Sequence, residues 1–249
     1  RLRSRGLGDV YKRQVNNNQL DRVQEFLHKH NCNVRFTVGY GSSEGGSNLT
    51  FQMAPKSVHN GNVGIPMPLN DMGVFKPGTQ EELGYNEMGE ICTVGPGNML
   101  GYDRRSATAK TLQRHADGRI WLHTGDIGYV DEDGVFYVLN RGAAYRYGGG
   151  ELAVLPMENR LADAKIKGIK DEFFVLIEDE DHDGYFVPYL YVVLEDGYKV
   201  DDIIKDVQSC LEPYMFPVEI LAIDERPFFH FKTNRIELSK ELKKKNHDC

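Results

Sequence analysis

The stretch WLHTGDIGYVDEDG, residues 121–134, decides how the chain is interpreted, because an apolar run leads into a turn and a second apolar run, VFYVLN, follows. Asp133 and Gly134 separate the two runs, which predicts a tight β-hairpin. Asp126 follows a Thr-Gly pair at the expected end of a strand. A carboxylate there can accept hydrogen bonds from both hydroxyls of a ribose, whereas Asp133 is better explained by the hairpin turn.

Short strands with Gly, Pro and Asp turns surround this hairpin. They run from about residue 60 to 140 and predict a small β subdomain. The composition then shifts through the glycine-rich junction RGAAYRYGGG, which we expect to be flexible. Beyond it, periodicity predicts helices over 156–164 and 201–211 and strands over 173–177 and 189–194. This part of the chain therefore has the pattern of a compact α+β domain.

A helix and a strand are expected before the β subdomain. Leu20, Val23, Phe26 and Leu27 share one face of a helix that runs from about residue 18 to 30. In NVRFTVGY, residues 33–40, every second residue is apolar or aromatic, which predicts a strand.

The loop GYGSSEGG, residues 39–46, joins an aromatic ring, two hydroxyls and a carboxylate. A nucleobase can stack on Tyr40, the hydroxyl of Ser42 or Ser43 can meet a phosphate, and Glu44 can hold Mg²⁺ through oxygen. A polar loop after a core strand explains this segment equally well when it is taken alone.

Composition excludes some functions and favours others. The 249 residues carry a formal net charge of -7, whereas nucleic-acid and anionic-membrane binding favour a basic excess. The four cysteines are far apart and show no metal-ligand spacing, which suits reduced thiols. No apolar run is long enough to span a membrane, and no signal peptide is visible. We therefore expect a cytoplasmic protein without nucleic-acid partners.

The first residues, RLRSRGLGDVYKRQ, show neither helical nor strand periodicity and carry no initiating Met. We interpret residues 1–14 as an artefact of translated adaptor sequence or as a disordered tail, and we exclude them from the fold.

Five segments occur in an order that resembles a known family. They are GYGSSEGG, GEICTVGPG with the later Gly-Tyr pair at 101–102, WLHTGDIGYVDEDG, Arg141 before the glycine-rich junction, and LEPYMFP at 211–217. Together they resemble the adenylate-forming superfamily of acyl-CoA synthetases, peptide-synthetase adenylation domains and luciferases, over about residues 19–242. The glycines of GEICTVGPG have an architectural explanation as turns between strands.

The resemblance implies both a fold and a domain division. Residues 15–140 would be the C-terminal part of the large α/β AMP-binding domain, and residues 141–245 the small, mobile α+β domain. It also implies that Tyr40 stacks on adenine, Ser43 approaches the α-phosphate and Glu44 coordinates Mg²⁺. Asp126 would bind ribose, and Arg141 would contact ribose or phosphate near the hinge.

The implied reaction joins a carboxylic acid to a thiol at the expense of ATP. A carboxylate attacks the α-phosphorus of MgATP to give an acyl-adenylate and pyrophosphate, and a thiol, often that of coenzyme A, then displaces AMP. A lysine of the small domain normally helps the first half. Here the alignment on Ile236 and Glu237 places Asn234 and Arg235 on the family's Gly-Lys pair, and Lys232 is the alternative cation.

Two further departures weaken the expected activity. The family's upstream phosphate loop is absent, so we expect this chain alone to be inactive, and Ala144 stands where the family has its hinge acid. A carrier-loading adenylation module and a nucleotide-binding remnant remain open as alternatives. The acid that is activated cannot be read from these residues.

Overall fold

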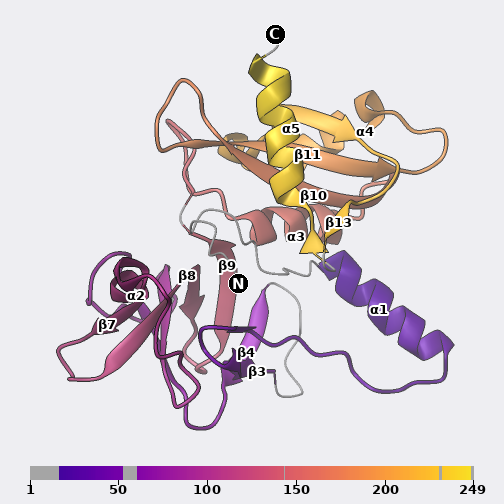
Figure 1. The fold of residues 1–249 in the computed structure, drawn as a ribbon. Helices are drawn as coiled ribbons and strands as arrows, with labels where there is room; N and C mark the ends of the chain where they lie inside the picture. The colour runs from indigo at the N-terminus through magenta and orange to yellow at the C-terminus, as the bar shows by residue number, and fades with distance from the viewer. Residues whose placement is uncertain (1–16, 53–60, 143, 230–231, 248–249) are drawn as a thin grey trace. The chain divides into compact units, whose positions relative to one another are not determined.

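The computed structural model describes residues 17–52, 61–142, 144–229 and 232–247, and these form two compact units (Figure 1). One unit is Leu20–Gly142, and the other consists of the described residues after 143 together with residues 17–19. The predicted tail, residues 1–14, lies outside the described residues. None of the described helices has the length and apolar character needed to cross a membrane.

An antiparallel sheet of seven strands dominates the unit Leu20–Gly142. Its strands in spatial order are β3 (Thr50–Phe51), β4 (Asn62–Pro66), β9 (Phe136–Arg141), β8 (Ile120–Val130), β6 (Gly89–Val94) and β5 (Asp71–Phe75), with β7 (Leu112–Arg114) paired to β8. Alternate side chains point inward, and Val63, Val74, Ile91 and Phe136 belong to one buried cluster. The predicted β subdomain is confirmed.

The predicted hairpin joins β8 to β9. Asp131 closes its turn, because one carboxylate oxygen accepts hydrogen bonds from the backbone N–H groups of Asp133 at 3.0 Å and Val135 at 2.9 Å. Gly134 has a φ of +75°, which glycine adopts without a steric penalty. The acidic residues of this turn therefore serve the hairpin, as the sequence predicts.

The predicted helix is α1 (Asn17–Lys29), but the predicted strand over residues 33–40 is wrong. A strand needs a neighbour to share its backbone hydrogen bonds, and here side chains partner the backbone instead. Gln24 accepts from the Phe36 N–H at 3.0 Å, and Gln52 from the Val38 N–H at 3.4 Å. The first strands come directly after this segment, where β1 (Gly41–Ser42) and β2 (Ser47–Asn48) form a short hairpin. The loop that contains Glu44 connects them.

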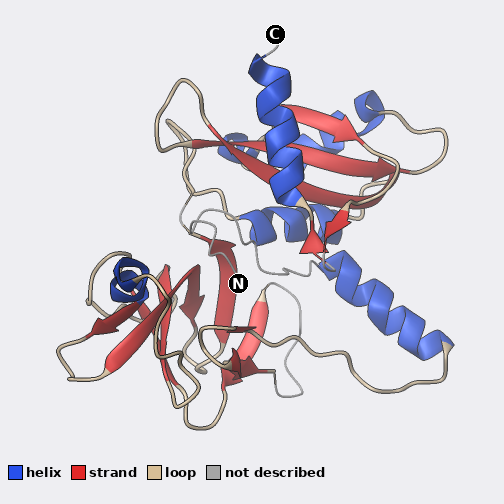
Figure 2. Ribbon diagram, in the orientation of Figure 1, coloured by secondary structure: helices blue, strands red, loops and turns tan. Residues whose placement is uncertain are grey.

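The second unit is built on a three-stranded sheet with helices on both faces (Figure 2). Its strands are β10 (Ile169–Glu178), β11 (Phe186–Leu194) and β12 (Glu219–Ala222), the last parallel to β11. Its helices are α3 (Val154–Ala164), α4 (Val200–Ser209), the 3₁₀ turn η1 (Pro213–Met215) and α5 (Arg235–His247), and a short hairpin of β13 (Phe228–Phe229) and β14 (Lys232–Thr233) precedes α5.

Strand β10 separates two hydrophobic clusters, because successive side chains point to opposite faces. Phe174 packs in the cluster that contains Met157 of α3 and Ile203 of α4. Phe173 packs in the other cluster, with Leu238 of α5. Both phenylalanines are fully buried. The sheet and its helices confirm the predicted fold class, an α/β region followed by an α+β domain.

The glycine-rich junction, expected to be flexible, is held by specific contacts within the second unit. The Arg146 guanidinium donates to the backbone carbonyls of Tyr214 at 3.1 Å and Phe216 at 2.5 Å. A Cβ added to Gly149 would lie 2.6 Å from the Tyr214 side chain, so only glycine fits this approach. The segment LEPYMFP therefore anchors the junction.

A buried carboxyl in β10 predicts an unusual dependence of stability on pH. Glu172 is only 3% exposed, and burial, with further repulsion from Asp171 and Glu158, raises its pKa to about 8 against the opposing charge of Arg226. Between pH 4.5 and about 8 the folded chain keeps a proton that the unfolded chain has lost. The free energy of unfolding should therefore fall as the pH rises through this window.

Replacing Glu172 by Gln is expected to remove this loss, which is on the order of 1 kcal/mol per pH unit where it is fully developed. Urea unfolding at pH 5 and pH 8 measures it, with Glu178→Gln at the exposed end of the same strand as the control. Equal pH dependence in the wild type and Glu172→Gln would contradict the assignment.

Candidate functional site

Asp126 lies on an irregular segment of β8. Opposite it on β6, Glu90 pairs with Ile127 while Cys92 pairs with His123, so residues 124–126 face a single residue of the neighbouring strand. Gly125 has a φ of +72° within this segment. Such a β-bulge bends the strand and re-aims its side chains. We call residues 124–126 the TGD bulge.

The Asp126 carboxylate is held between two of the predicted site residues. It is 1% exposed, and its two oxygens accept hydrogen bonds from the Tyr40 hydroxyl at 2.5 Å and from the Arg141 guanidinium at 2.8 Å. Arg141 lies directly opposite Asp126 on β9. Burial, reinforced by the charge of Asp126, raises the pKa of Tyr40, so this phenol stays protonated and donates.

Arg141 also fixes the bulge itself. Its guanidinium donates to the backbone carbonyl of Thr124 at 2.5 Å and lies 3.5 Å from where a Cβ on Gly125 would be. Burial opposes its charge, but the Asp126 carboxylate outweighs burial and raises the pKa of Arg141. Arg141 therefore keeps its positive charge beside the Asp126 carboxylate, on two neighbouring central strands of the sheet.

Glu44 lies in the loop between β1 and β2 and is half-buried. Its carboxylate accepts a hydrogen bond from the Tyr102 hydroxyl at 2.9 Å, and its backbone carbonyl accepts from the Met99 N–H at 2.7 Å. Burial and this bond raise the pKa of Tyr102. Glu44 also contributes to the field at Arg141, so it belongs to the same charged region. Ser43, beside it in the turn, is exposed.

The donor set around Glu44 suits a hard cation. Carboxylate oxygen is the ligand type that Mg²⁺ takes from proteins, usually alongside phosphate oxygens and water. Only one of the two Glu44 oxygens bonds to Tyr102. Glu44 therefore fits the magnesium role that the sequence assigns to it.

Arg235 and Lys232 belong to the second unit. Arg235 is 3% exposed, its guanidinium forms an ion pair with Glu158 at 2.6 Å, and its Nε donates to the Phe174 carbonyl at 2.9 Å. This arginine is thus engaged inside its own unit. Lys232 lies in β14, with its backbone opposite Phe229. The structure describes the backbone of this lysine but not its side chain.

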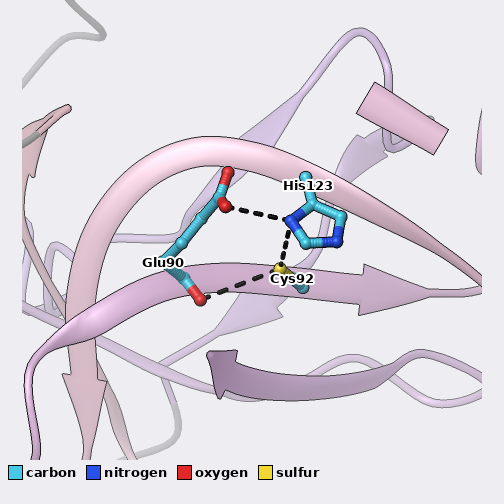
Figure 3. A group of neighbouring side chains, drawn as sticks. All are labelled: Glu90, Cys92 and His123. Atoms are coloured by element: carbon cyan, nitrogen blue, oxygen red, sulfur yellow. Dashed lines mark hydrogen bonds and ion pairs between the residues drawn. The ribbon is translucent and has the colours of Figure 1, made fainter. Parts of the chain in front are cut away.

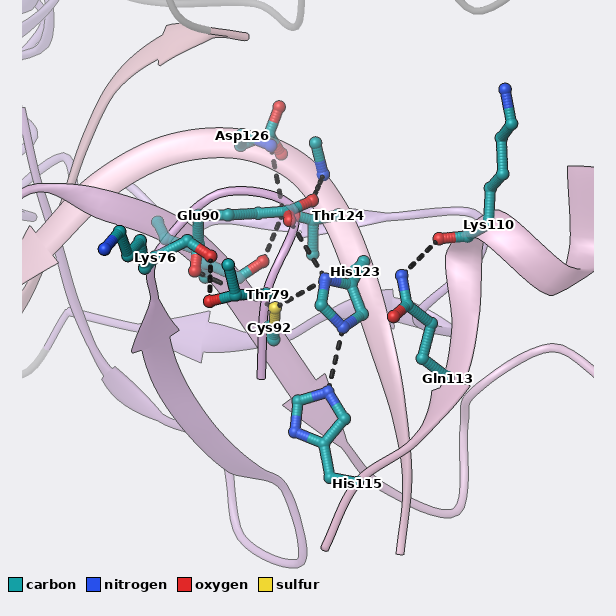
Figure 4. Close-up of polar contacts among 12 residues, drawn as sticks. Lys76, Thr79, Glu90, Cys92, Lys110, Gln113, His115, His123, Thr124 and Asp126 are labelled. Atoms are coloured by element: carbon teal, nitrogen blue, oxygen red, sulfur yellow. Dashed lines mark hydrogen bonds and ion pairs between the residues drawn. The ribbon is translucent and has the colours of Figure 1, made fainter. Parts of the chain in front are cut away.

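A polar network beneath the TGD bulge was not found by sequence reasoning. The His123 imidazole contacts the Glu90 carboxylate at 2.9 Å, the Cys92 thiol at 3.4 Å and His115 at 2.9 Å (Figure 4). Burial raises the pKa of Cys92 and lowers that of His115, which favours the neutral form of both. Strand pairing brings these residues together, so their spacing gave no signal.

Known proteins resemble this chain in sequence. The family model described as "AMP-binding enzyme" matches residues 20–103. The chain is 33% identical over 178 residues to 4-coumarate--CoA ligase 1 of Glycine max, a match that covers 67% of this chain and 56% of the relative. It thus spans about half the length of that relative.

Two solved structures share the fold. ATP-bound MatB from Rhodopseudomonas palustris superposes with a TM-score of 0.74 at 22% identity, covering 90% of this chain and 43% of that one. O-succinylbenzoate coenzyme A synthetase from Bacillus subtilis, solved with ATP and a magnesium ion, gives a TM-score of 0.63 at 25% identity, covering 87% and 42%. By its family model and its relatives, the chain belongs to the adenylate-forming superfamily of AMP-binding enzymes.

Proposed function

We propose that the chain carries the nucleotide-binding part of an ATP-dependent ligase that activates a carboxylic acid as an acyl-adenylate and then forms a thioester, with coenzyme A as the thiol. The observation that carries the proposal is the buried Asp126 carboxylate, aimed by the TGD bulge and held by Tyr40 and Arg141. An ionised carboxylate only accepts hydrogen bonds, which is the chemistry that the two hydroxyls of a ribose require.

The remaining side chains take complementary roles. The exposed Ser43 hydroxyl would approach the α-phosphate, and Glu44 would hold Mg²⁺, which supplies positive charge to the phosphates. Arg141 would contact ribose or phosphate from the side of the bulge. Tyr40 is 5% exposed, so its contact with adenine requires the neighbouring loop to move, while its hydroxyl fixes Asp126.

The first half of the reaction needs a cation near the α-phosphorus. An oxygen of the substrate carboxylate attacks the α-phosphorus, the bond to pyrophosphate breaks, and negative charge accumulates that a cation must stabilise. Because Arg235 is engaged with Glu158, we assign this role to Lys232. In the second half, a thiol attacks the acyl carbon and AMP leaves.

Replacing Lys232 by Ala in a complete protein that contains this chain is expected to lower acid-dependent pyrophosphate exchange by about 100-fold or more, the usual effect of losing one charge-stabilising group. Lys240→Ala, at an exposed position of α5, is the matched control and should leave exchange unchanged. If Lys232→Ala shows the same rate of pyrophosphate exchange as the wild type, Lys232 is not the stabilising cation, and Arg235 becomes the candidate for that role.

The activity itself is tested by pyrophosphate exchange with a panel of carboxylic acids, followed by thioester formation with and without coenzyme A. A folded complete protein that shows no acid-dependent exchange would contradict the proposal. Thioester formation on a carrier protein's phosphopantetheine, but not on free coenzyme A, would identify a carrier-loading module instead.

The engagement of Arg235 favours one further candidate, a nucleotide-binding remnant that has lost adenylation. This remnant would bind AMP and ATP through Asp126 but catalyse no exchange with any acid. Exchange that appears only in the Arg235→Lys variant would support it.

A further inference from the structure

Glu90 of β6 contacts the middle residue of the TGD bulge and the residue that precedes the bulge. One carboxylate oxygen accepts a hydrogen bond from the Gly125 N–H at 2.8 Å, and the other lies 2.9 Å from Nδ1 of His123. Its side chain is 14% exposed. Because the ladder between β6 and β8 is interrupted here, the carboxylate takes the place of a backbone partner for Gly125.

The contacts of His123 fix the orientation of that carboxylate. An ionised carboxylate only accepts hydrogen bonds, so Nδ1 of His123 must carry the proton that it shares with Glu90. Nε2 of the same ring lies 2.9 Å from Nε2 of His115, within hydrogen-bond distance. The carboxylate of Glu90 and the imidazole rings of His123 and His115 thus form one chain of hydrogen bonds. Figure 3 shows the contact between Glu90 and His123.

The backbone carbonyls of the bulge are bonded from β9 and its end, because Arg141 donates to Thr124 and the Gly142 N–H donates to Gly125 at 2.9 Å. The Thr124 hydroxyl donates to the Ile91 carbonyl at 2.6 Å and accepts from the Asp126 N–H at 3.1 Å. Glu90 supplies the bond to Gly125, the residue between them. A carboxylate outside the proposed ribose contacts therefore helps Tyr40 and Arg141 to fix the direction of the Asp126 side chain.

We propose that Glu90, oriented by His123, is a positioning residue that holds the TGD bulge and so aims Asp126 at its ligand. The effect on nucleotide binding rests on the proposed function, whereas the effect on the bulge does not. The separation of 2.9 Å between Glu90 and His123 is a hydrogen-bond distance. Glu90, Cys92 and His123 nevertheless offer three donor atoms within 4.8 Å of one another, so a bound metal ion is an outcome that the test must distinguish.

The experiment compares Glu90→Ala, Glu90→Gln and the matched control Glu87→Ala in this chain. Glu87 also accepts a hydrogen bond from a glycine N–H, that of Gly84 at 2.7 Å, but in an exposed turn. NMR measures amide hydrogen exchange at Gly125 and the tautomer of His123, and calorimetry measures the Kd for AMP.

We expect Glu90→Ala to speed exchange at Gly125 by about 10-fold or more and to weaken AMP binding by about the same factor, as the loss of a charge-assisted hydrogen bond predicts. In Glu90→Gln the amide oxygen can still accept a hydrogen bond from the Gly125 N–H. The amide NH₂ group then faces Nδ1 of His123 and donates to it, so the proton of the His123 ring should move from Nδ1 to Nε2. Glu87→Ala should match the wild type in every measurement.

Unchanged exchange at Gly125 in Glu90→Ala overturns the proposal. If that variant does not fold, an unchanged His123 tautomer in Glu90→Gln overturns it equally. If elemental analysis finds one equivalent of zinc in the wild type and none in Cys92→Ala, Glu90, Cys92 and His123 are metal ligands, and the proposal that Glu90 acts through hydrogen bonds is overturned. Absence of AMP binding in the wild type overturns the proposed function only, and exchange at Gly125 still decides the role of Glu90.

Discussion

Replacing Asp126 by Asn is expected to weaken the binding of AMP to this chain by about 100-fold, because two charge-assisted hydrogen bonds to ribose hydroxyls are lost together. Asparagine keeps the shape of the side chain but has one oxygen, and its NH₂ group faces either the Tyr40 hydroxyl or the Arg141 guanidinium. Isothermal titration calorimetry with AMP and ATP measures the change.

The control for this prediction is Asp103→Asn, the same chemical change at an exposed position of the same unit. Urea unfolding of both variants shows whether each is folded under the binding conditions, since Asp126→Asn also breaks a buried ion pair. An Asp126→Asn variant that binds AMP as tightly as the wild type would show that ribose is bound elsewhere.

The second large effect is expected in the other unit. Replacing Arg235 by Ala should lower the free energy of unfolding by about 3–5 kcal/mol, because the Glu158 carboxylate would be left charged and buried. Glu158 is 1% exposed, and the same oxygen accepts from Arg235 at 2.6 Å and from the Phe174 N–H at 2.9 Å. The pair therefore links α3, β10 and α5.

An exposed ion pair of the same unit provides the control. Arg160 and Glu212 lie 3.3 Å apart with both side chains about half exposed, and Arg160→Ala should cost at most about 1 kcal/mol. The double variant with Arg235→Met and Glu158→Leu should recover much of the lost stability, since no charge is left buried. If Arg235→Ala is as stable as the wild type, the guanidinium is not buried and a direct role in adenylation becomes the better explanation.

Hydrophobic periodicity predicted those helices and strands whose apolar residues repeat clearly on one face. The helix near residue 18, the hairpin around Gly134 and the two strands predicted over 173–177 and 189–194 are present, the latter as β10 and β11. Residues 33–40 show the limit of this reasoning, because alternation sets the faces of a strand but does not supply a neighbour to pair with. Helix α2 (Arg105–Thr111) and helix α5 have weak apolar patterns and were not anticipated.

The site was predicted in part for the same reason. Tyr40, Asp126 and Arg141 were named from motifs, and the structure places their side chains in contact. Glu90 and His115 were missed because their relation to the bulge arises from strand register, which brings together residues that are far apart in the sequence. The predicted roles of these side chains remain to be tested by the variants above.

The anchored junction has a fixed residue on each side of the division between the two units. On one side Arg141 is tied to the TGD bulge, and on the other Ala144 is buried, with its carbonyl accepting from the Leu152 N–H at 2.7 Å. Between these two attachments lie only Gly142 and one further residue. The division between the two units is therefore sharp in the sequence, since the last anchored residue of one unit and the first of the other are only three positions apart.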